Sequence, residues 1–388
     1  MIRLTRIAAT IVTVSTLVAA VAAQTPASVT ARGEWTTDAR HGWYSDDGPR
    51  VQINLRSADG SDNWGFGVPV AELEGLSPAV QSGSAHDIRF SWRREAGTFN
   101  FQGSFDRGRG AGSYTFSANP SFVSGMASLG YRDLDPSSLV RLAVVDVTQA
   151  YIRGLAEAGY KGLPFDDVVR MRIHRVTPEM IRELASLGYN GISSDELVRM
   201  RIHGATPEFI RSIEAAGFKG LSTDELVRFR IHRVTPEFVQ AMAKLGYRAV
   251  DREQIVRFRI HKVSPEFVNA LADRGYTGIP AEDLVKMKIH NVSVADIDEY
   301  KQLGYGGLDP DELVKMRIHR VTPAFIKEIH AVGYKMATID QLVRMRIHRV
   351  DAQFIKDLQA DGYQNLTVSD VLDLAIRGPR FSRVRRQP

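Results

Sequence analysis

The sequence contains no cysteine in its 388 residues. This absence excludes a disulfide framework, a thiolate metal site and a lipid-modified cysteine at the start of an exported chain. The chain must therefore fold on its apolar core alone. Its 44% hydrophobic and 24% charged residues are ordinary for a globular protein, so disorder is not expected.

Long apolar runs are absent after residue 23, so no later transmembrane helix is expected. At the N-terminus, Arg3 and Arg6 precede an apolar stretch, and Ala20-Val21-Ala22 provides an A-x-A cleavage site. Residues 1–23 are predicted to be a signal peptide and 24–32 a linker, with an uncleaved membrane anchor as the alternative. Export to the periplasm or the extracellular medium follows, and a cysteine-free chain suits either.

A strongly charged domain is also missing, although the net charge is +5. Residues 119–376 carry 34 basic and 34 acidic side chains, and the excess lies at the two ends. A neutral body argues against nucleic acid as a partner. The basic C-terminal residues 378–388 are predicted to form a disordered tail, with weak contact to an anionic surface as its expected use.

Known catalytic motifs do not occur. The chain has no H-E-x-x-H metal motif, no G-x-S-x-G nucleophile elbow and no phosphate-binding P-loop. We therefore expect no enzyme, no cofactor and no metal site. An enzyme of an unrecognised type remains as a third alternative.

What the sequence does contain is a repeat of 29 residues. A Gly-aromatic pair recurs nine times at this step, from Gly130-Tyr131 to Gly362-Tyr363. A histidine follows the same step at His174, His203, His232, His261, His290, His319 and His348. The period is shorter than that of tetratricopeptide, ankyrin or HEAT units.

Residues 193–221 show how one unit is predicted to fold. Ser193 and Glu196 form an S-x-x-E capping box that opens a first helix, helix A, and Gly204 can end it. Thr206 is then the N-cap of helix B, followed by Pro at its first position. Gly217 ends helix B. Each unit is thus an αα-hairpin.

Short helices of this kind are marginal alone and gain stability by stacking, so residues 119–377 are predicted to form an α-solenoid. The terminal copies are altered: Val145 replaces the first histidine and Arg377 the last. Residues 33–118 instead alternate, as in Val51-Gln52-Ile53-Asn54-Leu55, between Gly-rich turns. They are predicted to form a small antiparallel all-β domain, a meander or sandwich, with aromatic residues in its core.

The repeat phrase of residues 195–203, with Thr206-Pro207-Glu208-Phe209-Ile210 and Gly217-Phe218, resembles repeats of uncharacterised bacterial envelope proteins. Similar repeats accompany antirepressor-type sensor metallopeptidases. Trp64-Gly65-Phe66-Gly67 and Gly97-Thr98-Phe99 resemble the β segment found with them. The resemblance implies an accessory or sensory role in the envelope. The peptidase part is absent, so no catalytic residue is carried over.

The histidine column is predicted to be structural. Stacked helices lie about 8–10 Å apart, whereas one metal ion needs ligands within about 2.1 Å of itself. The histidines instead fall in the last turn of each helix A, where an imidazole can bond free carbonyls and suits the helix dipole.

Two basic columns accompany the histidines. The first, represented by Arg199, follows acids by three and four positions, so ion pairs within one helix are expected. The second falls between Leu197 and Val198 on the apolar side of helix A, which favours a structural ladder bonded to an adjacent unit, with an anion-binding groove as the alternative. Its members are Arg172, Arg201, Arg230, Arg259, Lys288, Arg317 and Arg346.

These features favour an exported, non-enzymatic scaffold that binds a protein or peptide partner in the cell envelope through its solenoid. The alternative is a sensory accessory of envelope signalling, with the β domain as the ligand sensor. The sequence leaves both functions open.

Overall fold

The computed structural model describes residues 30–37, 44–45, 48–77, 84–378 and 384. The predicted signal peptide, most of the linker and most of the basic tail lie outside these residues. The chain divides into two compact units, the first ending at Ile173 and the second starting at His174. In the described part of the chain, no helix is long and apolar enough to span a lipid bilayer.

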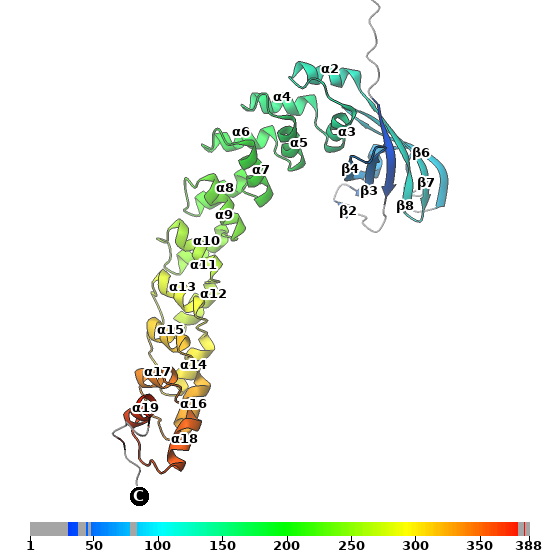
Figure 1. Cartoon of the computed structure of the whole chain (residues 1–388). Helices are drawn as coiled ribbons and strands as arrows, with labels where there is room; N and C mark the ends of the chain where they lie inside the picture. The colour runs from blue at the N-terminus through cyan, green and yellow to red at the C-terminus, as the bar shows by residue number, and fades with distance from the viewer. Residues whose placement is uncertain (1–29, 38–43, 46–47, 78–83, 379–383, 385–388) are drawn as a thin grey trace, which may run out of the picture. The chain divides into compact units, whose positions relative to one another are not determined.

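The first unit contains one curled antiparallel sheet (Figure 1), which confirms the predicted β domain. Of the forms expected, a single sheet is found rather than two layers. The order is β2-β3-β1-β8-β7-β6-β5, with β4 paired to β3. The strands are β1 (Thr30–Thr37), β2 (Tyr44–Ser45), β3 (Gly48–Ser57), β4 (Asn63–Pro69), β5 (Leu73–Glu74), β6 (Ser84–Arg94), β7 (Gly97–Asp106) and β8 (Arg109–Ala118).

The alternating pattern places aromatic side chains on one face of this sheet. Trp35 is 1% exposed, and its ring centroid lies 5.2 Å from that of Phe90. Phe90 stacks on Phe101 at 4.6 Å. Such pairs add about 0.5–1.5 kcal/mol each beyond the area they bury. In the Trp64–Gly67 stretch, Phe66 is half-buried and stacks on Trp92 at 5.0 Å.

Four helices complete the first unit: α2 (Pro120–Ser128), α3 (Pro136–Val145), α4 (Gln149–Glu157) and α5 (Phe165–Ile173). Helix α3 packs on β1, β7 and β8. The Asn119 side chain caps α2 and also donates to the carbonyl of Glu95 at 3.1 Å. Arg94 pairs with Asp146, past the end of α3, at 2.5 Å. The first helices are therefore packed and bonded to the sheet.

The second unit is an array of helical hairpins, which confirms the predicted solenoid. Each odd-numbered helix, here helix A, contacts the next odd one, and each even-numbered helix B contacts the next even one. The A helices are α7 (Ser194–His203), α9 (Thr223–Ile231), α11 (Arg252–Ile260), α13 (Ala281–Ile289), α15 (Pro310–Ile318), α17 (Ile339–Ile347) and α19 (Val368–Arg377). The B helices are α6 (Pro178–Ser186), α8 (Pro207–Ala215), α10 (Pro236–Lys244), α12 (Pro265–Ala272), α14 (Val294–Gln302), α16 (Pro323–Ala331) and α18 (Ala352–Ala360).

The helix ends follow the predicted signals. Ser193 and Glu196 form the reciprocal capping box of α7, and Gly204 at φ 72° ends that helix. Thr206 accepts a hydrogen bond from the backbone N–H of Phe209 at the start of α8. Gly217, at φ 120°, ends α8, and the next N–H reaches back to the carbonyl of Ile213.

The aromatic residue after each helix-ending glycine does more than pack. The Tyr189 hydroxyl donates to the carbonyl of Leu221 at 2.7 Å, which joins one B–A turn to the next. Burial raises the pKa of Tyr189. The same bond, 32 residues ahead along the chain, is made by Tyr131, Tyr247, Tyr305 and Tyr334. The sequence of one unit does not predict this bond, because its acceptor lies in the next unit.

Replacing Gly217 with valine should destabilise the second unit. Its φ of 120° is outside the left-handed region that other residues tolerate, and a β-branched side chain is least suited to it. We expect a loss of about 1–3 kcal/mol in the free energy of unfolding, measured by urea denaturation.

The matched control is Gly204→Arg. Its φ is 72°, and the equivalent residues Arg233 and Arg320 adopt φ 55° and 56°. Added atoms there meet the flexible end of Arg230. The left-handed backbone costs the arginine about 1–2 kcal/mol, and the lower entropy of the unfolded chain offsets about 0.4–1 kcal/mol of this. We therefore expect a net loss of about 1 kcal/mol in the unfolding free energy, smaller than that of Gly217→Val. Equal losses in the two variants would contradict the assigned roles of these two helix ends.

Candidate functional site

Each helix A carries one large apolar side chain that the fold does not bury. In α7, Leu197 and Met200 are fully buried and Val198 is 5% exposed, but Ile202 is 57% exposed. The same residue type recurs at each step of the repeat, with exposed fractions between 44% and 57%. The set is Ile173, Ile202, Ile231, Ile260, Ile289, Ile318, Ile347 and Ile376.

Helix geometry explains the exposure of Ile202. At about 100° per residue, Met200, Leu197 and Val198 cover an arc of roughly 160° that faces the core. Ile202 falls about 40° beyond Val198 and lies in the last turn, where helix A is about to end. Its position is therefore at the rim of the buried face, beside solvent.

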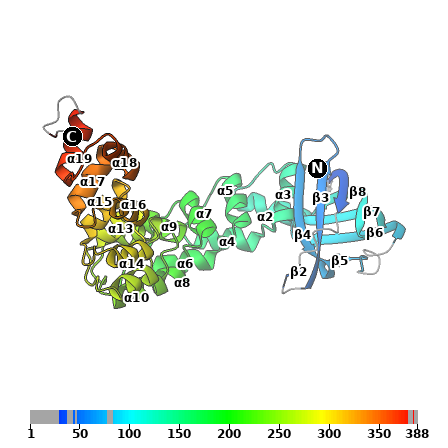
Figure 2. The same ribbon diagram turned by 90° about the horizontal axis from the view of Figure 1, so that it is seen from below.

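Seven of these side chains belong to the second unit, from Ile202 to Ile376, and we call them the isoleucine row. Consecutive A helices contact one another, and Figure 1 and Figure 2 show them following in order along the array. Because the seven residues occupy the same position in successive A helices, they form one apolar line. This row was not predicted from the sequence, although its signal, an Ile before each His, is present in the repeat.

The second basic column, which runs from Arg172 to Arg346, precedes each isoleucine of this set except Ile376 by one residue. Its side chains form contacts between neighbouring repeats. The Nε atom of Arg230 donates to the His203 carbonyl at 3.3 Å, and its guanidinium lies 4.9 Å from the centre of the Phe209 ring. Arg259 makes the equivalent contacts with His232 and Phe238, at 3.3 and 4.8 Å. These contacts support a structural ladder.

The other members of the second basic column make related contacts. Arg172 bonds both the carbonyl and the carboxylate of Asp146. Arg317 reaches the carbonyl of His290 at 3.4 Å and Asp296 at 3.1 Å. Lys288 and Arg346 lie over Phe267 and Phe325, at 4.6 and 4.8 Å. The hydrogen bond from Thr206 lowers the pKa of Glu208, and the nearby charge of Arg201 adds to this.

The first basic column pairs differently from the prediction. Local pairs are found for Arg170 with Asp167 and for Lys286 with Asp283. Most of the other pairs reach the first turn of the next helix A, so the expectation of pairing within one helix is wrong for them. These pairs are Arg199–Asp224, Arg228–Glu253, Arg257–Glu282 and Lys315–Asp340. The middle of one helix A faces the acidic start of its neighbour, which a single-helix argument does not consider.

The histidine column lies at the ends of the A helices, half-buried or exposed. The expected hydrogen bonds from imidazole to helix carbonyl are not found among the described residues. Instead, the backbone carbonyls of His203, His232 and His290 accept from arginines of the next repeat. Over the described ranges, no group of three or more His, Asp or Glu side chains could hold a metal ion.

The residue after each of these histidines has a left-handed backbone. Gly204 and Asn291 occupy it in two repeats. The others are basic, and we call them the cationic row: Arg175, Arg233, Lys262, Arg320 and Arg349, with φ between 55° and 58°. All five are exposed, and none forms an ion pair within the part of the chain that the structure describes.

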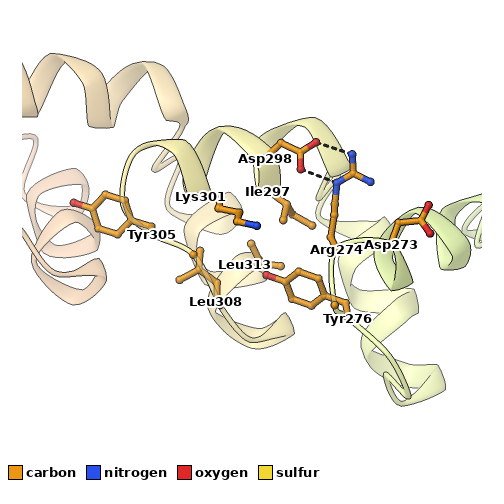
Figure 3. Close-up of a pocket in the computed structure, with 12 residues that line it drawn as sticks. Asp273, Arg274, Tyr276, Ile297, Asp298, Lys301, Tyr305, Leu308 and Leu313 are labelled. Atoms are coloured by element: carbon orange, nitrogen blue, oxygen red, sulfur yellow. Dashed lines mark hydrogen bonds and ion pairs between the residues drawn. The ribbon is translucent and has the colours of Figure 1, made fainter.

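A hollow between two B–A turns is the second candidate site. It has a volume of about 680 Å³ and is lined by Tyr276, Lys301 and Tyr305, with Arg274 and Asp298 paired through two bonds of 2.7 and 2.6 Å (Figure 3). An equivalent hollow recurs 58 residues earlier, with Ala216 and Gln240 at the positions of that pair. The hollow is thus a gap between turns that recurs along the array. In this copy, the charges of Arg274 and Asp298 neutralise each other.

Arg259→Leu should weaken the array. It removes the hydrogen bond to His232 and the cation–π contact with Phe238, for a loss of about 1–2 kcal/mol in unfolding free energy. Arg259→Lys keeps a cation over the ring, as Lys288 does, and should lose less. Denaturant titration of both variants checks this, and an unchanged midpoint for Arg259→Leu would refute the ladder.

No model of a known protein family matches the chain. No curated protein matches it either.

Proposed function

We propose that this protein is an exported, non-enzymatic repeat scaffold that binds a protein or peptide partner in the cell envelope through the isoleucine row. The single observation that supports this is the register of seven half-exposed isoleucines, one per repeat, on contiguous helices. Lone exposed apolar residues are normal on a protein surface, but a continuous set is typical of a binding surface.

The energetics agree with such a role. Complete burial of an isoleucine is worth about 1.5–3 kcal/mol, so covering a half-exposed one is worth about 1 kcal/mol. A partner that covers several of them gains enough to offset the cost of association. The row is also pre-organised, because each isoleucine is on a helix that buries three other apolar residues and, α13 excepted, has a side-chain cap at its N-terminus.

Export is part of the proposal and follows from the N-terminal sequence. If the signal peptide is removed, the mature chain begins at Ala23 or Gln24. We expect intact-mass measurement of the protein recovered from its native cells to give one of these N-termini. Recovery of the full chain in a membrane fraction would favour the uncleaved anchor.

A sensory accessory function is the second candidate, and a hollow on the sheet favours it. This hollow has a volume of about 580 Å³ and is lined by polar side chains of three adjacent strands, including Arg89, Asn100, Gln102 and Thr115. Because α3 packs on the same sheet, a ligand there would act on the unit that contains the first helices. Ligand binding by the sheet in the absence of any partner at the isoleucine row would favour this alternative.

The row is tested by site-specific photo-cross-linking in cells. A cross-linking amino acid at position 289 should give a discrete protein adduct, whereas the same group at Gln240, exposed on a B helix, should not. The triple variant Ile231→Ser, Ile260→Ser and Ile318→Ser should abolish the adduct from position 289.

The triple variant should stay folded but lose about 1 kcal/mol of unfolding free energy per substitution, because each isoleucine is already about half buried. Circular dichroism and a cooperative denaturant transition check that it is folded. An adduct that survives in this folded variant, or that appears equally at Gln240, would contradict the proposed function.

A further inference from the structure

We infer that the segment bound by the isoleucine row is an extended, acidic stretch of a partner protein with an apolar side chain at every third residue. This inference rests on the proposed function and adds the chemistry of the partner. It is carried by the cationic row, which lies two residues past the isoleucines along the chain.

The left-handed backbone does not explain why basic residues, rather than glycine, occupy the positions of the cationic row. A left-handed conformation costs a residue other than glycine about 1–2 kcal/mol, and Gly204 shows that glycine fits this position. At the B-helix ends the array uses glycine in each repeat, where φ is 87° or more. Attraction to the helix dipole offsets only about 0.3–1 kcal/mol of the cost. Exposed basic side chains are thus kept where glycine would be less strained.

An acidic residue follows the members of the cationic row in only part of the array. Glu179, Glu208, Glu237 and Glu266 hold the second position of their B helices. In the last three hairpins this position is Ala295, Ala324 and Gln353. Positive charge is therefore least compensated after Ile318, where Arg320 lies; after Ile347, Asp351 at the N-cap of α18 is two residues past Arg349. A partner segment needs its acidic side chains there.

Self-association through this surface is disfavoured by the same charges. Two copies that joined their isoleucine rows would bring two cationic rows together, and like charges at an interface cost several kcal/mol. An anionic bilayer is a poorer match as well. The row is one residue wide, and the four glutamates at the second positions of the first B helices add negative charge close to it along the chain, which anionic headgroups repel.

The spacing of the row fits an extended chain. Packed helices lie about 8–10 Å apart, so one isoleucine follows another at about that distance. A polyproline II segment rises about 3.1 Å per residue with three residues per turn, so every third side chain returns to the same face after about 9.3 Å. A β-strand turns its third residue to the opposite face, and an α-helix presents an apolar residue about every 5.4 Å.

The test uses the full chain and a labelled 21-residue peptide of seven Leu-Asp-Pro triplets, followed by fluorescence anisotropy. We expect binding at least tenfold tighter than that of two controls, Leu-Lys-Pro triplets and a scrambled peptide of the same composition. The double variant Arg320→Ala and Arg349→Ala should weaken binding at least fivefold. The control is the double variant Lys219→Ala and Lys335→Ala, which loses the same charge as the arginine variant but at exposed positions in B–A turns. It should bind the peptide as tightly as the wild type does.

Equal binding of the lysine peptide, or full binding by the Arg320/Arg349 variant, would overturn the acidic partner. Equal binding of the scrambled peptide would overturn the three-residue spacing. Binding to vesicles of anionic phospholipid that requires the isoleucine row, or a dimer in sedimentation that requires it, would overturn the inference that a partner protein covers this row. If the position-289 adduct forms in cells but the acidic peptide does not bind, this inference fails and the proposed function stands; loss of both removes the proposed function itself.

Discussion

The structure depends on one constraint: no hairpin of this size can bury its own apolar residues. Helix α7 has ten residues, and helices of that length are marginal in water. Leu197, Val198 and Met200 are removed from solvent only because the neighbouring hairpins pack against them. Side-chain caps at most helix N-termini reduce the cost of forming the helices, but the stacking of units supplies the stability of the array.

Many of the recurrent polar contacts follow the same rule, because they cross from one repeat to the next. Arg259 bonds the end of the previous helix A, Arg228 bonds the start of the following one, and Tyr247 joins consecutive turns. The capping boxes are the main exception, since they act within one helix. Neighbouring repeats are therefore joined by several polar bonds as well as by apolar packing, and we expect them to unfold together rather than singly.

Much of the fold could be predicted from the sequence, because the signals for it are local. The 29-residue step, the Ser193 box and the Thr206-Pro207 start each define a helix end without knowledge of the neighbours. The site could not be predicted in this way. Ile202 belongs to a residue type that is usually buried, and its exposure depends on where helix A ends relative to its neighbours. The partners of Arg199 and of the tyrosine hydroxyls lie in the next repeat, which single-helix reasoning does not reach.

The strict length of the repeat has an evolutionary consequence. No insertion separates the units from Gly130 to Gly362, so the gain or loss of one whole copy leaves the joints between the others unchanged. Each added copy would extend the array by one capped hairpin, one aromatic tether and one solvent-facing isoleucine. Duplication or deletion of 87 nucleotides could thus lengthen or shorten the isoleucine row by one residue at a time. The contacts between the other repeats would stay the same.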